Sequence, residues 1–273
     1  MLKKMKLMVT GILCLAMLFA LAGCGGGQGS GGMGESSGDL DLDAFTGIQL
    51  QAKSPNVSVV VGDGYHVTYQ LHERETVKQL EVVDGTLVFD SGKATNWQGG
   101  SEGYEVVITV PADAALASVQ IYTTAGTTSL KDIALGAADL SSVSGGFQLD
   151  NVKADEVKLL TGSGEVNVQG GQIGTVDVVT TDTNVNLDSE FNEVMAESSS
   201  GVITVSGSVA EKVTATTTTG AIYLEAPVAS VEAETISGSV YVGEAKQGND
   251  YSVSGGAPSA YLKTGSATIT ISK

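Results

Sequence analysis

The histidines and the clustered aspartates are the side chains in this sequence that could bind a metal. His66 and His72 are its two histidines, and a continuous strand would hold residues six apart about 20 Å from each other, too far for one metal ion. Asp39, Asp41 and Asp43 begin like a calcium-binding loop, but the glycine and the bidentate glutamate that such a loop needs do not follow. We therefore expect no metal and no cofactor, while calcium sites built from scattered carboxylates stay open.

Catalysis would need a nucleophile with a neighbouring base, or a pair of carboxylates. Most serines and threonines fall in repeats, where we expect structural hydroxyls. Adjacent repeats could bring Asp177 and Glu197 together as a glycosidase pair, although in a chain this acidic such pairs arise by chance. We therefore expect that the protein is not an enzyme, and an enzyme acting on polysaccharide is the third alternative.

Cys24 is a candidate for covalent modification because of the residues before it. Lysines at positions 3, 4 and 6 precede the apolar run 7–21, which is short for a membrane-spanning helix, and Leu21-Ala22-Gly23-Cys24 follows at once. This tetrapeptide resembles the lipobox of bacterial lipoproteins, in which the cysteine receives a diacylglycerol and becomes the first residue. We predict a signal peptide over 1–23, lipidation of Cys24, and a Gly/Ser tether over 24–39 that holds the protein to the membrane.

The charge of the chain limits its partners. Its 31 acidic and 14 basic side chains give a formal net charge of −17, and removal of three lysines with the signal peptide would lower it to −20. Nucleic acid and anionic headgroups would repel such a surface, and Arg74 is the only arginine available for bidentate phosphate recognition. We therefore expect no nucleic-acid partner, and contact with a membrane through the lipid anchor.

The elements that position these residues follow from a repeat with a step of 18 to 20 residues, interrupted once, over residues 119–273. Each repeat opens with alternating apolar residues and continues with a hydroxyl four residues after the opening residue. Seven residues after the opening residue, six of the eight repeats have glycine. A corner that needs close backbone approach or a positive φ would explain the glycine. The opening residues are Val119, Ala138, Val157, Val176, Val194, Val213, Val231 and Ala260, and the hydroxyls are Thr123, Ser142, Thr161, Thr180, Ser198, Thr217, Thr235 and Thr264.

Stacked coils are the fold that this period predicts. A second apolar alternation after the glycine, as in Phe147 and Leu149, gives each coil at least two strands. Each strand can pair in parallel with its equivalent one coil on, because a coil of about 19 residues supplies the crossover. We predict an all-β fold, a right-handed parallel β-solenoid (β-helix) of about eight coils, whose third side is either a short strand or an arc.

Both ends of the solenoid need covering, because an open coil exposes strand edges and core. Residues 40–118 contain alternating runs without the repeat, and Asp84-Gly85 between two such runs is a strong hairpin signal. We predict that 40–118 form N-terminal strands capping the solenoid repeats of 119–273. At the other end, we predict that the insertion 243–259 folds over the edge left after Ile271.

A family resemblance rests on the runs Asn56 to Val61, Asp84 to Phe89 and Val106 to Pro111, and on the Ser/Thr-x-Ser-Gly steps that follow them. Over roughly residues 45–273 the chain resembles the bacterial putative-adhesin β-strand-repeat family of unknown function. The resemblance implies a β-solenoid on the cell surface and brings no catalytic residues to this chain. Thr183 and Ala267 depart from the pattern, because they replace the corner glycine.

An apolar strip is the first candidate binding surface. The alternation places Leu160, Val179 and Met195 outward on three successive coils, with Tyr122 nearby, on a surface that is otherwise polar. Exposed apolar patches often mark contacts with a partner. The alternative is that a neighbouring loop covers these side chains, or that they only stabilise adjacent strands.

A pair of tyrosines is the second candidate binding surface. We expect Tyr223 and Tyr241 to stack outward one coil apart, with Asn167 and Asn186 further along the same ladder. Stacked rings can seat the face of a sugar. The same two alternatives, cover by a loop or a purely structural role, stay open here.

The lipobox, the tether, the repeats and the missing catalytic constellation lead to one hypothesis. We expect a non-enzymatic, lipid-anchored protein of the bacterial cell envelope, facing outside the cytoplasm, whose solenoid serves adhesion or binds an unknown protein or glycan partner. The alternative is an envelope-stress or regulatory accessory that binds a membrane protein.

Overall fold

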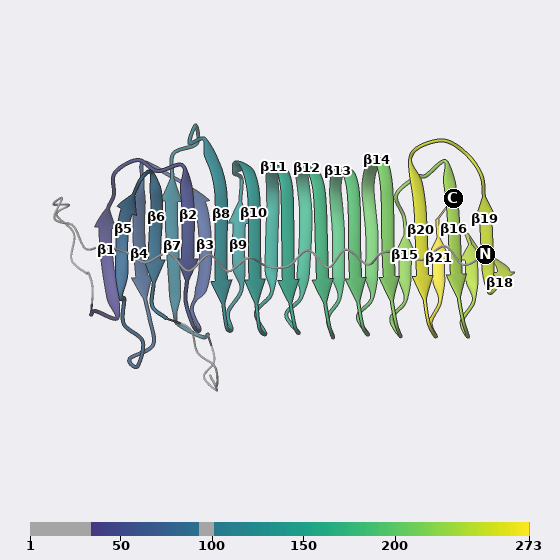
Figure 1. Ribbon diagram of the computed structural model, residues 1–273, viewed down its shortest axis with the longest axis horizontal. Coiled ribbons are helices and arrows are strands. Elements are labelled where there is room, and N and C mark those ends of the chain that lie inside the picture. Colours follow the sequence, from purple (N-terminus) through teal and green to yellow (C-terminus); the bar gives the residue numbers. More distant parts are fainter. Residues whose placement is uncertain (1–33, 93–100, 273) are drawn as a thin grey trace, which may run out of the picture.

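The computed structural model of the chain describes residues 34–92 and 101–272, and within these ranges the secondary structure consists of β-strands without helices. The predicted signal peptide, the lipidation of Cys24 and most of the tether lie outside the described residues. No helix in the described ranges is long and apolar enough to cross a membrane. The strands lie side by side along the long axis of an elongated molecule (Figure 1).

Strands in the centre of the molecule pair in parallel with the equivalent strand one repeat away, like rungs of a ladder. Leu140 aligns with Ile121 in one neighbouring rung and with Leu159 in the other. Because equivalent residues align, one core extends along the whole array, and the predicted inward-facing alternation is confirmed. The central strands are β8 (Leu116–Thr123), β9 (Thr128–Lys131), β10 (Ala134–Ser142), β11 (Phe147–Thr161), β12 (Val166–Thr180), β13 (Val185–Ser198), β14 (Ile203–Thr217) and β15 (Ile222–Leu224).

Strands β11 to β14 each bend and run from the second side of one coil, through its third side, into the first side of the next coil, as β11 does from Phe147 to Val157. β11 pairs with β12 on both sides of its bend, so the third side is a strand in these rungs rather than a loose arc. At the bend, Asp132, Asn151 and Gly170 follow one another at one-repeat intervals with φ of 55°, 52° and 63°. Aspartate, asparagine and glycine are the residues that best tolerate this left-handed backbone, so they are a repeat signal that the sequence analysis missed.

The predicted hydroxyls and glycines form one hydrogen-bonded corner. All eight hydroxyl side chains are buried, and in five rungs the hydroxyl accepts a hydrogen bond of 2.7–3.2 Å from the glycine N–H three residues on. A Cβ on Gly145 would lie 1.9 Å from the carbonyl oxygen of Gly126, and one on Gly220 would lie 1.9 Å from that of Gly201. Of the six corner glycines only Gly126 has a positive φ, so close approach between rungs is the general reason for glycine.

At the N-terminal end, the order of strands in space differs from their order in the chain. β2 (Gly47–Gln51) lies between β8 and β6 (Thr86–Asp90), and β3 (Asn56–Val61) lies between β9 and β7 (Glu105–Val110), all in parallel. Ile48 aligns with both Val119 and Leu87, which are buried. The inward-facing register of the repeats therefore continues into this end.

Antiparallel strands finish the N-terminal end (Figure 1). β4 (His66–Gln70) pairs with β7, β1 (Ser37–Asp41) pairs with β4, and β5 (Gln79–Val83) pairs with β6. The predicted hairpin is confirmed, because Asp84 and Gly85 join β5 to β6 with φ of 48° and 74°.

The C-terminal end also changes the chain order. β20 (Ser259–Thr264) lies between β14 and β16 (Ser230–Thr235), and β21 (Ile269–Ile271) lies between β15 and β17 (Val240–Val242), all in parallel. The last strands of the chain are therefore internal and leave no edge after Ile271.

The insertion covers a different edge from the one predicted. β18 (Ala245–Gly248) and β19 (Asp250–Val253) pair antiparallel with β17 and β16, the outermost parallel strands at this end (Figure 1). The prediction was wrong about the order because every rung carries the same apolar pattern, and the pattern does not say which rungs are neighbours. A linker as long as 243–258 lets the last two strands return to an inner position.

Candidate functional site

The apolar strip of Leu160, Val179 and Met195 lies on the outer face formed by β11, β12 and β13. Its side chains are 44 %, 39 % and 44 % exposed, so the predicted outward orientation is confirmed. Leu160 and Val179 are aligned neighbours, whereas Met195 aligns with Asp177 and lies diagonally from Val179. The strip therefore crosses the strands obliquely. Tyr122 is separated from Leu160 by the intervening Ser141.

Charged residues surround the apolar strip. Lys158 and Glu156 form an ion pair of 2.6 Å, and this hydrogen bond raises the pKa of Lys158. Burial raises the pKa of Asp177, the Lys158 charge opposes this shift, and Glu156 adds to it. Asp139, which aligns with Lys158, and Glu197, which aligns with Val179, add further carboxylates at the border. The strip thus combines an apolar centre with a mainly negative rim.

Asp177 and Glu197, the carboxylates considered for catalysis, are diagonal neighbours on this same outer face. Two stretches also match G-x-S-x-G, at residues 34–38 and 99–103. That motif supports a nucleophile on a strand-to-helix turn, and residues 34–92 and 101–272 include no helix. Within the described residues, neither G-x-S-x-G stretch leads into the helix that this chemistry requires.

The histidines lie in different surroundings from each other. His66 on β4 places its Nε2 2.8 Å from Asp39 and its Nδ1 2.8 Å from Asp41, both on the paired strand β1. His72 lies against the ring of Tyr104, at a centroid distance of 5.1 Å. Among the described residues, no group of three or more histidine, cysteine or acidic side chains is arranged to hold a metal.

The tyrosine pair differs from its prediction. Tyr223 and Tyr241 both align with Thr270 of β21, which lies between them. Two rung spacings of about 4.8 Å separate them, so their rings do not stack on adjacent rungs. The insertion of β21 between β15 and β17 is the reason. Tyr223 is nonetheless 39 % exposed.

The tyrosines belong to a longer row of aligned outward residues without any charge, which we call the neutral ladder. On adjacent rungs of this row the Asn186 amide donates a 2.8 Å hydrogen bond to Oδ1 of Asn167. The ladder follows the second side of the solenoid over nine aligned positions: Ser58, Ser129, Gln148, Asn167, Asn186, Thr204, Tyr223, Thr270 and Tyr241.

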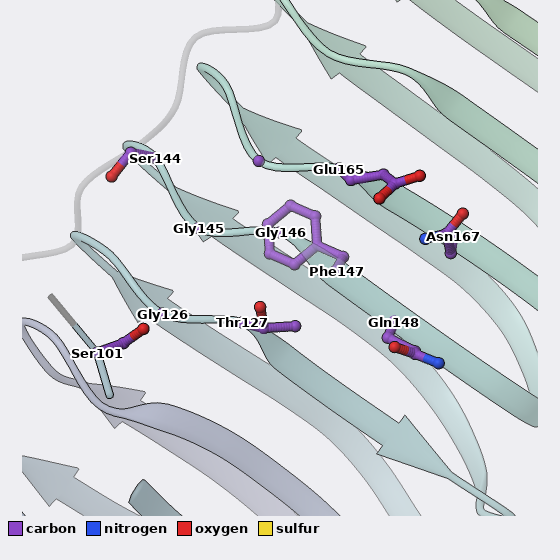
Figure 2. Close-up of a pocket in the computed structure, with 11 residues that line it drawn as sticks. Ser101, Gly126, Thr127, Ser144, Gly145, Gly146, Phe147, Gln148, Glu165 and Asn167 are labelled. Atoms are coloured by element: carbon purple, nitrogen blue, oxygen red, sulfur yellow. The ribbon is translucent and has the colours of Figure 1, made fainter. Parts of the chain in front are cut away.

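A depression of about 330 Å³ adjoins the neutral ladder at the corner. Thr127, Gln148, Glu165 and Asn167 line it from three successive rungs, beside the stacked corner glycines (Figure 2). Its lining is mostly hydroxyl, amide and backbone groups, with Glu165 as the charged side chain. Gln148, Glu165 and Thr127 are not among the site residues predicted from the sequence, although Gln148, Asn167 and Asn186 follow one another there at one-repeat spacing.

Comparisons with known proteins agree on the fold. The sequence profile of the family described as Toastrack DUF4097 matches residues 45–273. A putative adhesin of Bacteroides fragilis is similar in structure, with a TM-score of 0.53 and 15 % identity over 85 % of this chain and 94 % of its own. No curated protein matches the chain significantly.

Two further solved structures are similar at lower TM-scores. A putative adhesin of Parabacteroides merdae has a TM-score of 0.47 and 14 % identity, over 87 % of this chain and 96 % of its own. A putative lipid-binding protein of Parabacteroides distasonis has a TM-score of 0.46 and 15 % identity, over 85 % and 94 %.

Proposed function

Since this chain belongs to the Toastrack DUF4097 family, we propose that it is a non-enzymatic, lipid-anchored protein of the bacterial cell surface that binds a partner through the outer faces of its solenoid. The putative adhesin from Bacteroides fragilis shares the fold, and the role suggested by its description supports adhesion as the purpose of the binding. The partner in this proposal is a protein or a glycan.

The position at which the chain enters the solenoid is the observation that carries the proposal. The N–H of Gly34 donates to the carbonyl of Val77, the N–H of Val77 donates to Glu35, and the N–H of Leu71 donates to Ser36, at 2.6–2.9 Å. Residues 34–36 are thereby attached to the capped end, next to β1. A lipid on Cys24 would hold the protein by one end and leave its long faces open to a partner.

The experiment for the anchor uses the two cysteines of the chain. Cys24→Ala should move the protein from the membrane fraction to the soluble fraction, whereas Cys14→Ala, inside the proposed signal peptide, should leave it on the membrane. Mass spectrometry of the wild-type protein should find a diacylated residue 24 at the N-terminus. A Cys24→Ala protein that still fractionates with membranes would overturn the anchor.

A second candidate is a regulatory accessory of the envelope that binds a membrane protein, and the apolar strip favours it. Leu160, Val179 and Met195 with their acidic rim have the apolar centre and polar border of a protein interface. Capture of one membrane protein by the wild type, lost with Leu160→Asp and kept with Gln120→Asp on the same face, would support this role over adhesion to a glycan.

We also propose the handedness of the solenoid, its number of coils, and the bounds of its cap and tether. Parallel strands joined by a crossover within one sheet turn right-handed in about 98 % of known cases, and on this ground we take the solenoid of 119–273 as right-handed. Its eight sequence repeats are the reason for proposing about eight coils. Residues 40–118 would act as its cap. Because residues 34–36 and β1 are hydrogen-bonded to this cap, the tether predicted over 24–39 would be limited to 24–33. A crystal structure with a left-handed turn would contradict the first part.

A further inference from the structure

We propose that the neutral ladder and its adjoining depression bind an uncharged oligosaccharide. This inference rests on the proposed surface function and names the ligand class and the site. A surface row with no charged side chain over nine positions is unusual in a protein of net charge −17, so its composition points to a ligand without charge.

The polar groups at the depression have the chemistry that sugar hydroxyls need. Each hydroxyl of a sugar both donates and accepts hydrogen bonds, and a side-chain amide offers one group of each kind. The amide of Gln148 and the hydroxyl of Thr127 are exposed and have no hydrogen bond within the described residues. Asn167 accepts from Asn186 through Oδ1, which leaves its NH₂ group for a ligand. Glu165 can accept from sugar hydroxyls.

The aromatic end of the ladder supplies the apolar contact. Tyr223 lies four rungs from Gln148, a separation of about 19 Å, and its ring is exposed. Asn167, Asn186 and Thr204 occupy the rungs between them. An oligosaccharide lying along the long axis would place its terminal unit in the depression, hydrogen-bond to the amides and stack a ring face on the tyrosine.

The carboxylates near the depression favour neutral sugars over acidic ones. Glu165 lines the depression, and Asp150 and Asp188 project from the same strands two residues beyond Gln148 and Asn186. These carboxylates would repel a uronic acid, a sialic acid or a phosphorylated sugar at the depression. The lysines nearest in register lie outside the ladder: Lys131 aligns with Asp150, and Lys246 aligns with Tyr241 at the far end. A protein partner fits the ladder poorly, because it lacks the apolar centre of such interfaces between Gln148 and Tyr223.

The experiment measures binding of the full-length lipoprotein in detergent to defined oligosaccharides. The neutral panel contains oligomers of glucose, galactose, mannose and N-acetylglucosamine, and the acidic probe is an oligogalacturonate. We expect at least one neutral oligomer to bind and the acidic probe not to bind. Gln148→Ala combined with Asn167→Ala should weaken binding about tenfold or more, since at least two hydrogen bonds to the ligand are lost.

Control variants separate the site from folding defects. Gln148→Arg, at an exposed position, should weaken neutral binding by its bulk without changing the unfolding midpoint, whereas Gln120→Arg on the other face should not affect it. Absence of binding to the whole neutral panel, or equal binding by the acidic probe, would overturn the inference. Loss of binding with Leu160→Asp but not with the double variant would move the site to the apolar strip. Failure of the surface function itself would appear separately, in the fractionation of Cys24→Ala.

Discussion

At the capped end, the side chain of Glu75 links three separate segments of the chain by hydrogen bonds. This carboxylate is fully buried, where its Oε1 accepts from the N–H of Lys53 at 2.8 Å and from the hydroxyl of Ser91, and its Oε2 accepts from the hydroxyl of Ser54 at 3.3 Å. A buried polar group is tolerated when hydrogen bonds replace its hydration. Glu75 therefore joins the loop before β5 to the loop between β2 and β3 and to the end of β6.

Substitution of Glu75 by glutamine should lower the free energy of unfolding by about 2–3 kcal/mol, because the amide cannot accept all three hydrogen bonds and leaves buried donors unsatisfied. Urea unfolding followed by circular dichroism measures this cost. The matched control is Glu73→Gln, an exposed glutamate two residues away, which should stay close to the wild type. Equal stability of the two variants would show that the buried network contributes little.

Asp177→Asn should make the protein more stable at neutral pH, and the gain should disappear in acid. Burial raises the pKa of Asp177 above its usual value of 3.8, so the folded state resists ionisation of this carboxyl. The protonated side chain therefore favours folding below the usual pKa, and this contribution is lost as the pH rises through the folded-state pKa. Unfolding of both proteins between about pH 3 and pH 7 tests the sign. A difference that does not vary with pH would contradict the assignment.

Within a rung, the buried hydroxyl and the corner glycine three residues later stabilise the corner together. The hydroxyl of Thr217 accepts from the N–H of Gly220 at 3.0 Å and so satisfies a corner amide. Thr180 stands at the same position of another rung, where Thr183 replaces the corner glycine, and within the described residues its buried hydroxyl has no hydrogen-bond partner. The two threonines therefore separate the contribution of the hydrogen bond from that of the side-chain shape.

Thr217→Val should lower the free energy of unfolding by about 1–3 kcal/mol, because the corner N–H loses its acceptor in a buried site. Thr180→Val keeps the same shape and removes an unsatisfied buried hydroxyl, so it should be neutral or slightly stabilising. Thermal unfolding of the two variants gives the comparison directly. Similar losses at both positions would mean that packing of the hydroxyl, rather than its hydrogen bond, supports the corner.

For the whole molecule, the exchanged order of strands at both ends is the main architectural result. β2 and β3 enter between strands that come later in the chain at one end, and β20 and β21 enter between strands that come earlier in the chain at the other. In both cases the outermost parallel strand is covered by antiparallel strands, which protect an edge that could otherwise pair with another molecule.

Engineered disulfides test this order. Lys263 lies between Thr216 and Glu234 and aligns with both of them. Thr216 and Glu234 are therefore two rungs apart. Cysteines at 216 and 263 should form a disulfide, because neighbouring rungs are about 4.8 Å apart, whereas cysteines at 216 and 234, about 10 Å apart, should not. The readout is the mobility of each double variant with and without reductant. Bridging of 216 to 234 alone would restore the chain order predicted from the repeats.

The sequence by itself determined the unit of this fold. Its period predicted parallel pairing between equivalent residues, its alternation predicted which side chains are buried, and its hydroxyl and glycine positions predicted the corner. It also placed Leu160, Val179 and Met195 on the surface. These features depend on residues within one repeat, and strand geometry translates such spacing directly into direction.

Tertiary structure alone decided which repeats are neighbours. Every rung presents the same apolar pattern and generic backbone hydrogen bonds, so the pattern permits many orders, and only the linkers and the packing at each end select one. That selection separates Tyr223 from Tyr241 and brings β2 beside β8. Contacts between distant segments, such as Glu75 with Ser91 or His66 with Asp39, likewise leave no periodic trace in the sequence.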